Sequence, residues 1–449
     1  MPQRVYQRVQ AAISQIDLVG LAPTMLAFMK ANIASQALVF QDQHGVTSKP
    51  GCVIASPSYS GVTNQDYVHH WVRDAAITAV EIAASLAPGN GVDQTLCDYV
   101  AFSATCQSNV DSDPDVGFFR ACFNIDGTPR DRWSDQKDGP ALQSLAFVQA
   151  WPYLETNAKV TATKVAQRNL DETVGDWQND IDKLGPWEDN KGPSFFARAA
   201  QVRLLEEVAT VNALGLSKPA GFDAALDGLS NALGTHWDDA QAYYRSIPGG
   251  QPGSASTDVS GYDPNADVVM ACIYGSMPCT DPKLLATAAK LRGAFDVGGP
   301  VGYSINEDDR DRGFGPMVGR YPSDTYDGDT SDAVNTGHPW ALCTANFAQL
   351  YYCLAKAFQA GHGVPYDKLT GPLFDQLGLD ETTVNDAARA ETVADALRTA
   401  GDKMLQAVIF HSDHYRLSEQ FDSATGYEKS VQDLTWSYAA YLSAVRERS

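Results

Sequence analysis

Apolar side chains recur at the 3.6-residue spacing of an α-helix along most of this 449-residue chain, and this periodicity constrains the fold most strongly. Strand-like alternation of apolar and polar residues is nearly absent. The pattern therefore predicts an all-α protein of about a dozen helices. The clear helical segments are expected at 71–86, 139–154, 194–213, 283–295, 339–360, 391–410 and 432–446, and weaker ones at 5–16, 21–35, 94–107, 157–169, 171–183 and 219–233.

Some of these segments are apolar on more than one face, which predicts helices enclosed by other helices. The segment 339–360 is the clearest example. Long loops rich in Gly, Asp, Tyr and Trp separate the helices, and loops of this length in a compact domain are usually functional or disordered. Their aromatic content favours a functional role. No linker divides the chain, so we expect a single domain over 1–449 with no appended binding module.

The charge balance excludes several classes of partner. The chain carries 55 acidic and 33 basic residues, a formal net charge of -22. Nucleic acids and anionic membranes both require basic patches, so neither is an expected partner. No run of 18 apolar residues is present, so no membrane span is expected. The amphipathic N-terminus lacks the pattern of a signal peptide, which leaves a cytoplasmic location open beside secretion.

Eight cysteines are present, an even number that is compatible with disulfides. Cys272 and Cys279 bracket a short loop and are the best candidate pair for a bridge. Cys343 and Cys353 fall in an apolar helix and are expected to be core thiols. No metal-ligand spacing of Cys and His is found, so we expect no metal and no cofactor.

Two carboxylates stand in aromatic-rich loops that each precede a helical run. Glu188 lies in GPWEDNKGPSFF, and Glu419 lies in LSEQFDSATG. Cleavage of a glycosidic bond needs one protonated carboxyl for the leaving oxygen and one ionised carboxyl that activates water, roughly 6.5–9.5 Å apart in an inverting enzyme. Burial beside Trp187 would raise the pKa of Glu188, the dipole of the nearby helix would lower it, and an acid catalyst needs burial to prevail. Ser418, Gln420 and Ser430 could donate hydrogen bonds that keep Glu419 ionised.

Three further loop segments carry groups that suit a sugar. DYVHHWVRD contains Tyr67, Trp71, Arg73 and Asp74 at a helix start. The Asp could be a helix cap and the Arg–Asp pair a structural ion pair. An Arg beside an Asp also offers both donors and acceptors to sugar hydroxyls. Trp133 and Arg320 lie in similar polar loops, and His69 and His70 could line the same pocket.

Five ordered blocks together resemble glycoside hydrolase family 15, the glucoamylases. The blocks are YVHHWVRD, FNIDG with the following Trp and DGPAL, PWEDNKGPSFF, GRYPSDTY with the following PW, and SEQFDSATG with DLTWSYAA. They extend from about residue 50 to residue 446. The resemblance implies an (α/α)6 barrel of six outer and six inner helices, with the active-site loops at one end. It also implies exo-hydrolysis of α-linked glucose with inversion, which releases β-D-glucose from non-reducing ends of α-1,4-glucans.

The resemblance also implies roles for single residues. Glu188 corresponds to the general acid and Glu419 to the general base. Arg73, Asp74 and Arg320 correspond to the grip on the terminal glucose. The other implied residues are the aromatic lining, Tyr67, Trp71, Trp133, Trp187 and Trp436, and the partners of the base, Gln420 and Ser430. Asp189 stands where the family usually has Glu, so we expect a weaker hold on the second sugar.

Other functions stay open at this point. Trehalase and glucodextranase share the same fold and family. A non-catalytic glycan-binding helical toroid would keep the Trp and Arg residues, but it would not need both Glu188 and Glu419. We favour a secreted, monomeric glucoamylase that acts on α-glucans and maltooligosaccharides.

Overall fold

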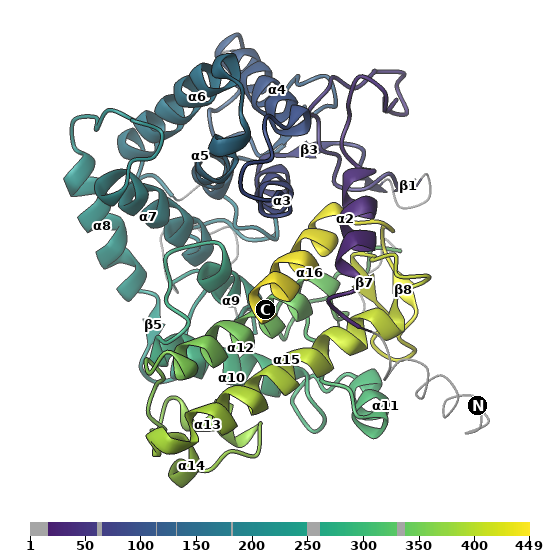
Figure 1. Cartoon of the computed structure of the whole chain (residues 1–449), viewed down its shortest axis with the longest axis vertical. Coiled ribbons are helices and arrows are strands. Elements are labelled where there is room, and N and C mark those ends of the chain that lie inside the picture. The colour runs from purple at the N-terminus through teal and green to yellow at the C-terminus, as the bar shows by residue number, and fades with distance from the viewer. Residues whose placement is uncertain are drawn as a thin grey trace.

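The computed structural model describes residues 17–60, 65–113, 115–131, 133–180, 183–248, 261–329 and 337–449 (Figure 1). The helix expected at 5–16 lies outside these residues. None of the helices in the described ranges is long and apolar enough to cross a membrane.

Within the described residues, six helices form an inner ring. Along the chain, each of the six packs on the next, and the last packs on the first, which closes the ring. The inner helices are α3 (Val72–Ala84), α5 (Asp138–Ala150), α7 (Phe195–Thr210), α9 (Ala266–Ile273), α12 (Ala341–Gln359) and α16 (Thr435–Arg448).

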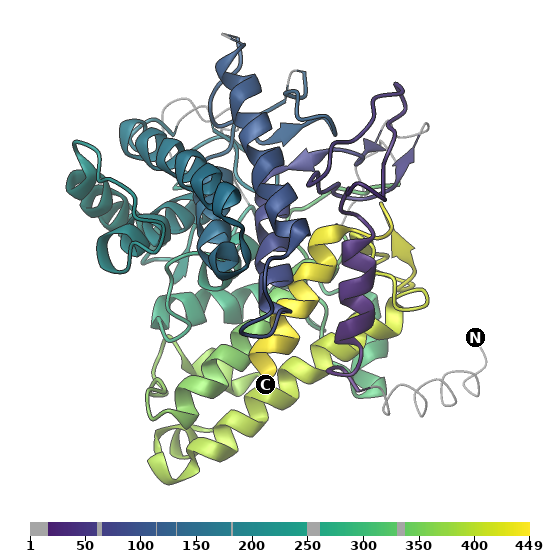
Figure 2. The ribbon, with the colours of Figure 1, turned by 45° about the horizontal axis from the view of Figure 1, so that its top comes forward.

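Six outer helices alternate with the inner ones in the described part of the chain. Each outer helix packs against at least one inner helix. Figure 1 and Figure 2 both show α2 beside α16, although the two helices lie near opposite ends of the sequence. The arrangement is an (α/α)6 barrel, and the predicted fold class is confirmed. The outer helices are α2 (Ala22–Lys30), α4 (Gln94–Asp111), α6 (Thr156–Gly175), α8 (Phe222–Gly234), α10 (Pro282–Phe295) and α15 (Ala390–His411).

The burial of the helices follows their sequence patterns. α12 is buried at 15 of its 19 positions, as predicted for a helix that is apolar on more than one face. Its neighbour α15 is amphipathic and packs along α12. The buried side of α15 includes Val393, Leu397, Met404 and Leu405.

Some predicted boundaries are wrong. The segments 157–169 and 171–183 were predicted as separate helices, but α6 runs unbroken to Gly175. Asn169 explains the continuity, because its side-chain amide is buried and donates to Pro140 O, Gln143 Oε1 and Ser144 Oγ on α5. Further helices were missed because they are too short to show a clear period. They are α9, α11 (Ser304–Arg312), α13 (Gly371–Asp375) and α14 (Glu381–Asn385), with two 3-10 turns at Trp151–Tyr153 and Ala387–Arg389.

Short antiparallel strand pairs tie the loops together. β3 (His70–Trp71) pairs with β4 (Cys122–Phe123), and β7 (Gln420–Phe421) pairs with β8 (Glu428–Lys429). The other two pairs in the described chain are β1 (Tyr59–Ser60) with β2 (Gln65–Asp66), and β5 (Trp237–Asp238) with β6 (Tyr243–Tyr244).

The predicted disulfide between Cys272 and Cys279 is wrong, because both residues are free thiols, as are the other six cysteines. Cys272 lies in the last turn of α9 and lines an internal cavity together with Cys353 of α12, whereas Cys279 does not line it. The sequence spacing of Cys272 and Cys279 does not show that the Cys272 side chain faces this cavity. Cys343 is buried as predicted, and Cys353 is partly buried.

Asp267 is a fully buried carboxyl in the first turn of α9. Its Oδ2 accepts a hydrogen bond from Ser246 Oγ at 2.5 Å, and its Oδ1 has no partner among the described residues. Burial raises the pKa of Asp267 to about 8. Between about pH 4, where an unfolded Asp ionises, and pH 8, the folded state therefore binds more protons than the unfolded state. This contribution to the free energy of unfolding is lost as the pH rises.

We predict that Asp267→Asn removes this loss. Differential scanning calorimetry measures the Tm of the variant minus the Tm of wild type. We expect this difference to be higher at pH 9 than at pH 5 by at least about 2 °C. Asp227→Asn, a change of an exposed carboxylate on α8, should leave the difference constant. An equally constant difference for Asp267→Asn would contradict the assignment.

Candidate active site

A cavity of about 730 Å³ lies at the N-terminal ends of the inner helices. Its wall consists largely of residues that precede these helices or belong to their first turns. Trp71 precedes α3, Trp340 precedes α12, and Leu434 precedes α16. The lining includes all the residues predicted to be catalytic or to contact substrate, namely Tyr67, Trp71, Arg73, Asp74, Trp133, Trp187, Glu188, Asp189, Arg320, Glu419 and Trp436.

The two carboxylates reach the cavity through constrained backbone. Glu188 adopts a φ of 62°, in the left-handed region that costs a non-glycine residue about 1–2 kcal/mol. Such strain is often found where a side chain must point into a functional site. Glu419 directly precedes β7, and the β7–β8 hairpin returns the chain so that Ser430 lies beside it. Ser430 also has a φ of 62°.

Three donors converge on one oxygen of Glu188. Its Oε1 accepts from Trp71 Nε1 at 2.9 Å, from Gln136 Nε2 at 2.7 Å and from Trp133 Nε1 at 3.3 Å. Arg73 Nη1 donates to Gln136 Oε1 at 2.5 Å, which fixes the orientation of that amide. Oε2 makes no hydrogen bond with any described residue, so it is the oxygen that can carry a transferable proton.

Glu419 is surrounded by hydroxyl groups. Tyr67 donates to its Oε1 at 3.0 Å, and Ser430 and Tyr326 donate to its Oε2 at 2.5 and 3.1 Å. Burial raises the pKa of Glu419, and the three hydrogen bonds and Arg320 oppose that rise. The hydroxyl donors lower the pKa of Glu419, which is the predicted direction, but burial raises it by more. The result is a stronger base than an exposed carboxylate.

Gln420 reaches Glu419 indirectly. Its Nε2 donates to Tyr326 O at 3.2 Å, and its Oε1 accepts from Gly328 N at 3.0 Å. The side chain therefore holds the loop that carries Tyr326, rather than Glu419 itself. Ser418 likewise donates to the Gln420 carbonyl and not to Glu419, contrary to the expectation from the sequence.

Arg73 is buried among acidic partners. Its Nη1 lies 3.0 Å from Asp138 Oδ2, its Nε lies 3.3 Å from Asp74 Oδ1, and its guanidinium carbon lies 4.8 Å from the ring centre of Trp436. Burial works against the guanidinium charge, but these carboxylates together raise the pKa of Arg73. Burial raises the pKa of Asp74 to about 7. Arg73 and Asp74 therefore form a structural ion pair that is also part of the cavity wall.

Arg320 forms another part of the cavity wall. It binds Asp324 through two hydrogen bonds, Nε to Oδ2 at 2.8 Å and Nη2 to Oδ1 at 2.6 Å. Asp189 lies 3.7 Å from its Nη1 and accepts from Tyr262 and Tyr321 hydroxyls at 3.0 and 2.5 Å. Aromatic rings also surround the guanidinium at 5.1–5.7 Å, namely Trp187, Tyr321, Tyr326 and Trp340.

Several residues of the site were not predicted from the sequence. Gln136 and Asp138 orient Glu188 and Arg73, and Asp324 pairs with Arg320. Only Asp324 had a local signal, because it stands four residues after its partner. Tyr326 and Trp340 also line the cavity. Trp133 was predicted to belong to the aromatic lining, and it lines the cavity. Its indole N–H also donates to Glu188, and the guanidinium carbon of Arg130 lies 4.1 Å from its ring centre.

His69 and His70 do not contribute to the cavity lining. His70 is buried, its Nδ1 accepts from Val53 N, and burial lowers its pKa to about 3. His69 lies beside Asp66. In the described ranges, no cluster of three or more His, Cys, Asp or Glu side chains could hold a metal ion.

This geometry suits acid–base chemistry on a polyhydroxylated substrate. Two carboxylates with different hydrogen-bond partners share one cavity, and two arginine–carboxylate pairs face it. Indole and phenol rings supply apolar surface for sugar rings.

Known proteins share this sequence and fold. The model of the family "Glycosyl hydrolases family 15" matches residues 25–446. A probable glucoamylase of Schizosaccharomyces pombe is 29% identical over 90% of this chain and 86% of its own length. Glucoamylase GLU1 of Saccharomycopsis fibuligera is 30% identical over 89% of this chain and 84% of its own length.

Solved structures show the same fold. The glucoamylase of Hormoconis resinae superposes with a TM-score of 0.76 at 24% identity, covering 96% of this chain and 74% of that chain. The glucoamylase of Saccharomycopsis fibuligera gives 0.75 at 24% identity, covering 96% of this chain and 95% of that chain. The family match spans nearly the whole barrel and both candidate carboxylates, and the chain belongs to glycosyl hydrolases family 15.

Proposed function

We propose that this protein is a glucoamylase, a glucan 1,4-α-glucosidase that releases β-D-glucose from the non-reducing ends of α-1,4-glucans. The observation that supports this most directly is the presence of Glu188 and Glu419 in one cavity, each with its own set of donors. Membership of the family and the glucoamylase names of its relatives point to the same activity.

Glu188 acts as the general acid. Trp71, Trp133 and Gln136 hold its Oε1, which leaves Oε2 to give a proton to the glycosidic oxygen. Protonation of the leaving oxygen lowers the barrier to departure of the sugar chain. Arg73 assists as a positioning residue, because it fixes the orientation of Gln136.

Glu419 acts as the general base. Its raised pKa makes it a better proton acceptor, while Tyr67, Tyr326 and Ser430 keep the ionised form accessible. It removes a proton from a water molecule that attacks the anomeric carbon on the face opposite the leaving oxygen. Attack from that face inverts the configuration and yields the β-anomer.

The arginine–carboxylate pairs define the end of the pocket. Arg73 with Asp74 and Arg320 with Asp324 offer charged donors and acceptors to the hydroxyls of a terminal glucose. A wall closed in this way accepts a chain end but blocks a continuing chain, which gives exo-action. Asp189 is tied to two tyrosines, and so it has less reach toward a second sugar than a Glu would have.

Trehalase and glucodextranase activities are the alternatives within the family, and a non-catalytic glycan-binding toroid is the alternative outside enzymes. A binding toroid would not need two such carboxyls in one cavity, Glu188 held through one oxygen by three donors and Glu419 surrounded by hydroxyl groups. The single-domain organisation without a starch-binding domain, the secreted location and the monomeric state stay predictions. Cell fractionation and light scattering would measure the last two.

Proton NMR of an early maltotriose digest tests the proposed function. We expect the first new anomeric signal to be that of β-D-glucose, together with maltose, because water attacks opposite the leaving group and cleavage starts at the chain end. Initial α-D-glucose would contradict the mechanism. Activity confined to trehalose or to α-1,6-linked glucans would instead favour the alternatives within the family.

Ser430→Ala should shift the acid limb of the pH profile. The hydroxyl stabilises ionised Glu419, so its loss raises the pKa of the base further. We expect the acid limb of kcat/KM to move to higher pH by about half a unit. Ser418→Ala is the matched control, because Ser418 bonds to the Gln420 carbonyl instead. A shift of equal size in both variants would refute a direct role of Ser430.

A further inference from the structure

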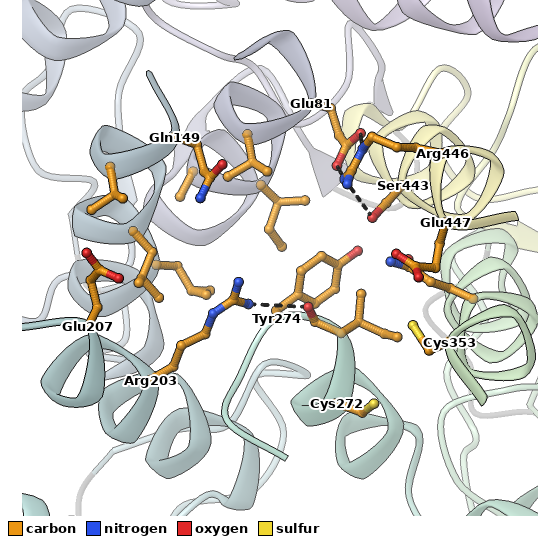
Figure 3. Close-up of a pocket in the computed structure, with 18 of the residues that line it drawn as sticks. Glu81, Gln149, Arg203, Glu207, Cys272, Tyr274, Cys353, Ser443, Arg446 and Glu447 are labelled. Atoms are coloured by element: carbon orange, nitrogen blue, oxygen red, sulfur yellow. Dashed lines mark hydrogen bonds and ion pairs between the residues drawn. The ribbon is translucent and has the colours of Figure 1, made fainter. Parts of the chain in front are cut away.

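A second cavity, of about 500 Å³, lies at the opposite end of the same ring. Figure 3 shows side chains from several inner helices converging on it. The lining comes from the middle and C-terminal parts of all six inner helices, whereas the active-site cavity lies at their N-terminal ends. It shares no lining residue with the active-site cavity. Its volume falls within the range of about 300–1,000 Å³ typical of small-molecule sites.

Arg203 of α7 lines this cavity with an incompletely used guanidinium. Its one hydrogen bond within the described residues runs from Nη1 to Ile273 O at 3.4 Å (Figure 3). No carboxylate of the described chain lies within ion-pair distance of it. Burial lowers the pKa of Arg203, and Glu207 only partly opposes this effect. The side chain therefore retains donors for a ligand.

Gln349 of α12 provides the complementary acceptor. Its side chain is 5% exposed and lines the cavity. Its Oε1 has no hydrogen-bond partner among the described residues. A buried amide oxygen left unpaired costs about 1–3 kcal/mol, so such atoms in folded proteins usually have a bound partner.

The charges around the cavity oppose an anionic ligand. Glu81 is paired with Arg446 and Glu447 with Lys356, whereas Glu206 and Glu207 add further negative charge. The C-terminal ends of the inner helices add partial negative charge as well. A small cation in the cavity would be repelled by the positive charge of Arg203. Apolar contact surface is supplied by Ile77, Val80, Leu142, Leu145 and Ile273.

We propose that this second cavity binds a neutral polyhydroxylated molecule the size of one or two sugar rings. Hydroxyl groups can accept from Arg203 and donate to Gln349, and the aliphatic wall suits the C–H faces of a sugar. The site is separate from the catalytic cavity and does not depend on the proposed activity. Its ligand is held by the barrel itself rather than by the active-site loops.

Saturation-transfer NMR with maltose as the probe tests this site. The active-site cavity is first filled with the pseudo-sugar inhibitor acarbose at saturation, so that remaining maltose signal reports the second cavity. We expect such a signal for wild type. Arg203→Met should weaken maltose binding at least tenfold through loss of donors. Leu145→Trp should weaken it equally by filling the cavity without changing a polar group.

Arg310→Met is the matched control, because Arg310 is an exposed arginine of α11 outside both cavities, and it should leave the signal unchanged. Retained acarbose binding by the cavity variants shows that they are folded. Absence of maltose signal in wild type, equal signal in all variants, or preferential binding of 1,4-diaminobutane or inorganic phosphate at Arg203 would each overturn the proposal. Failure of the proposed catalytic function would appear separately, as a lack of hydrolysis in wild type.

Discussion

The closure of the inner ring, with α16 packed on α3, is the constraint on which the rest of this molecule depends. Closure brings the start of α3 beside the start of α16, so that Arg73 stacks on Trp436 and Glu419 meets Tyr67. Because successive inner helices share one direction, their N-termini form one cavity and their C-terminal halves form another. Two carboxylates 231 residues apart (419 − 188) can then serve one substrate.

Burial of charge gives the active-site cavity its chemistry. Arg73 and Arg320 are nearly inaccessible to water, and each is stabilised by carboxylates and aromatic rings. An unpaired buried charge would cost several kcal/mol, so these partners are required for the arginines to remain in the wall. The same low-dielectric setting raises the pKa values of Asp74 and Glu419. One environment therefore both holds the buried arginines in place and raises the pKa values of these two carboxyls.

The sequence predicted the features that depend on local pattern. Helical period identified the long helices, and the loop motifs identified the carboxylates, arginines and tryptophans that share the cavity. Contacts between distant loops were not predictable in this way. Gln136 and Tyr326 became visible only when the fold placed them beside Glu188 and Glu419. The Cys272–Cys279 bridge failed for the same reason, because loop spacing does not give the direction of a thiol.

Hydrolysis of α-D-glucosyl fluoride by carboxamide variants tests the assigned roles most directly. Fluoride leaves without protonation, so the acid is dispensable for this substrate but the base is not. Glu188→Gln should lose maltose hydrolysis by orders of magnitude yet recover much of its kcat on the fluoride. Glu419→Gln should be inactive on both substrates. Recovery by Glu419→Gln instead, or near-normal maltose hydrolysis by either variant, would contradict the assignment of acid and base.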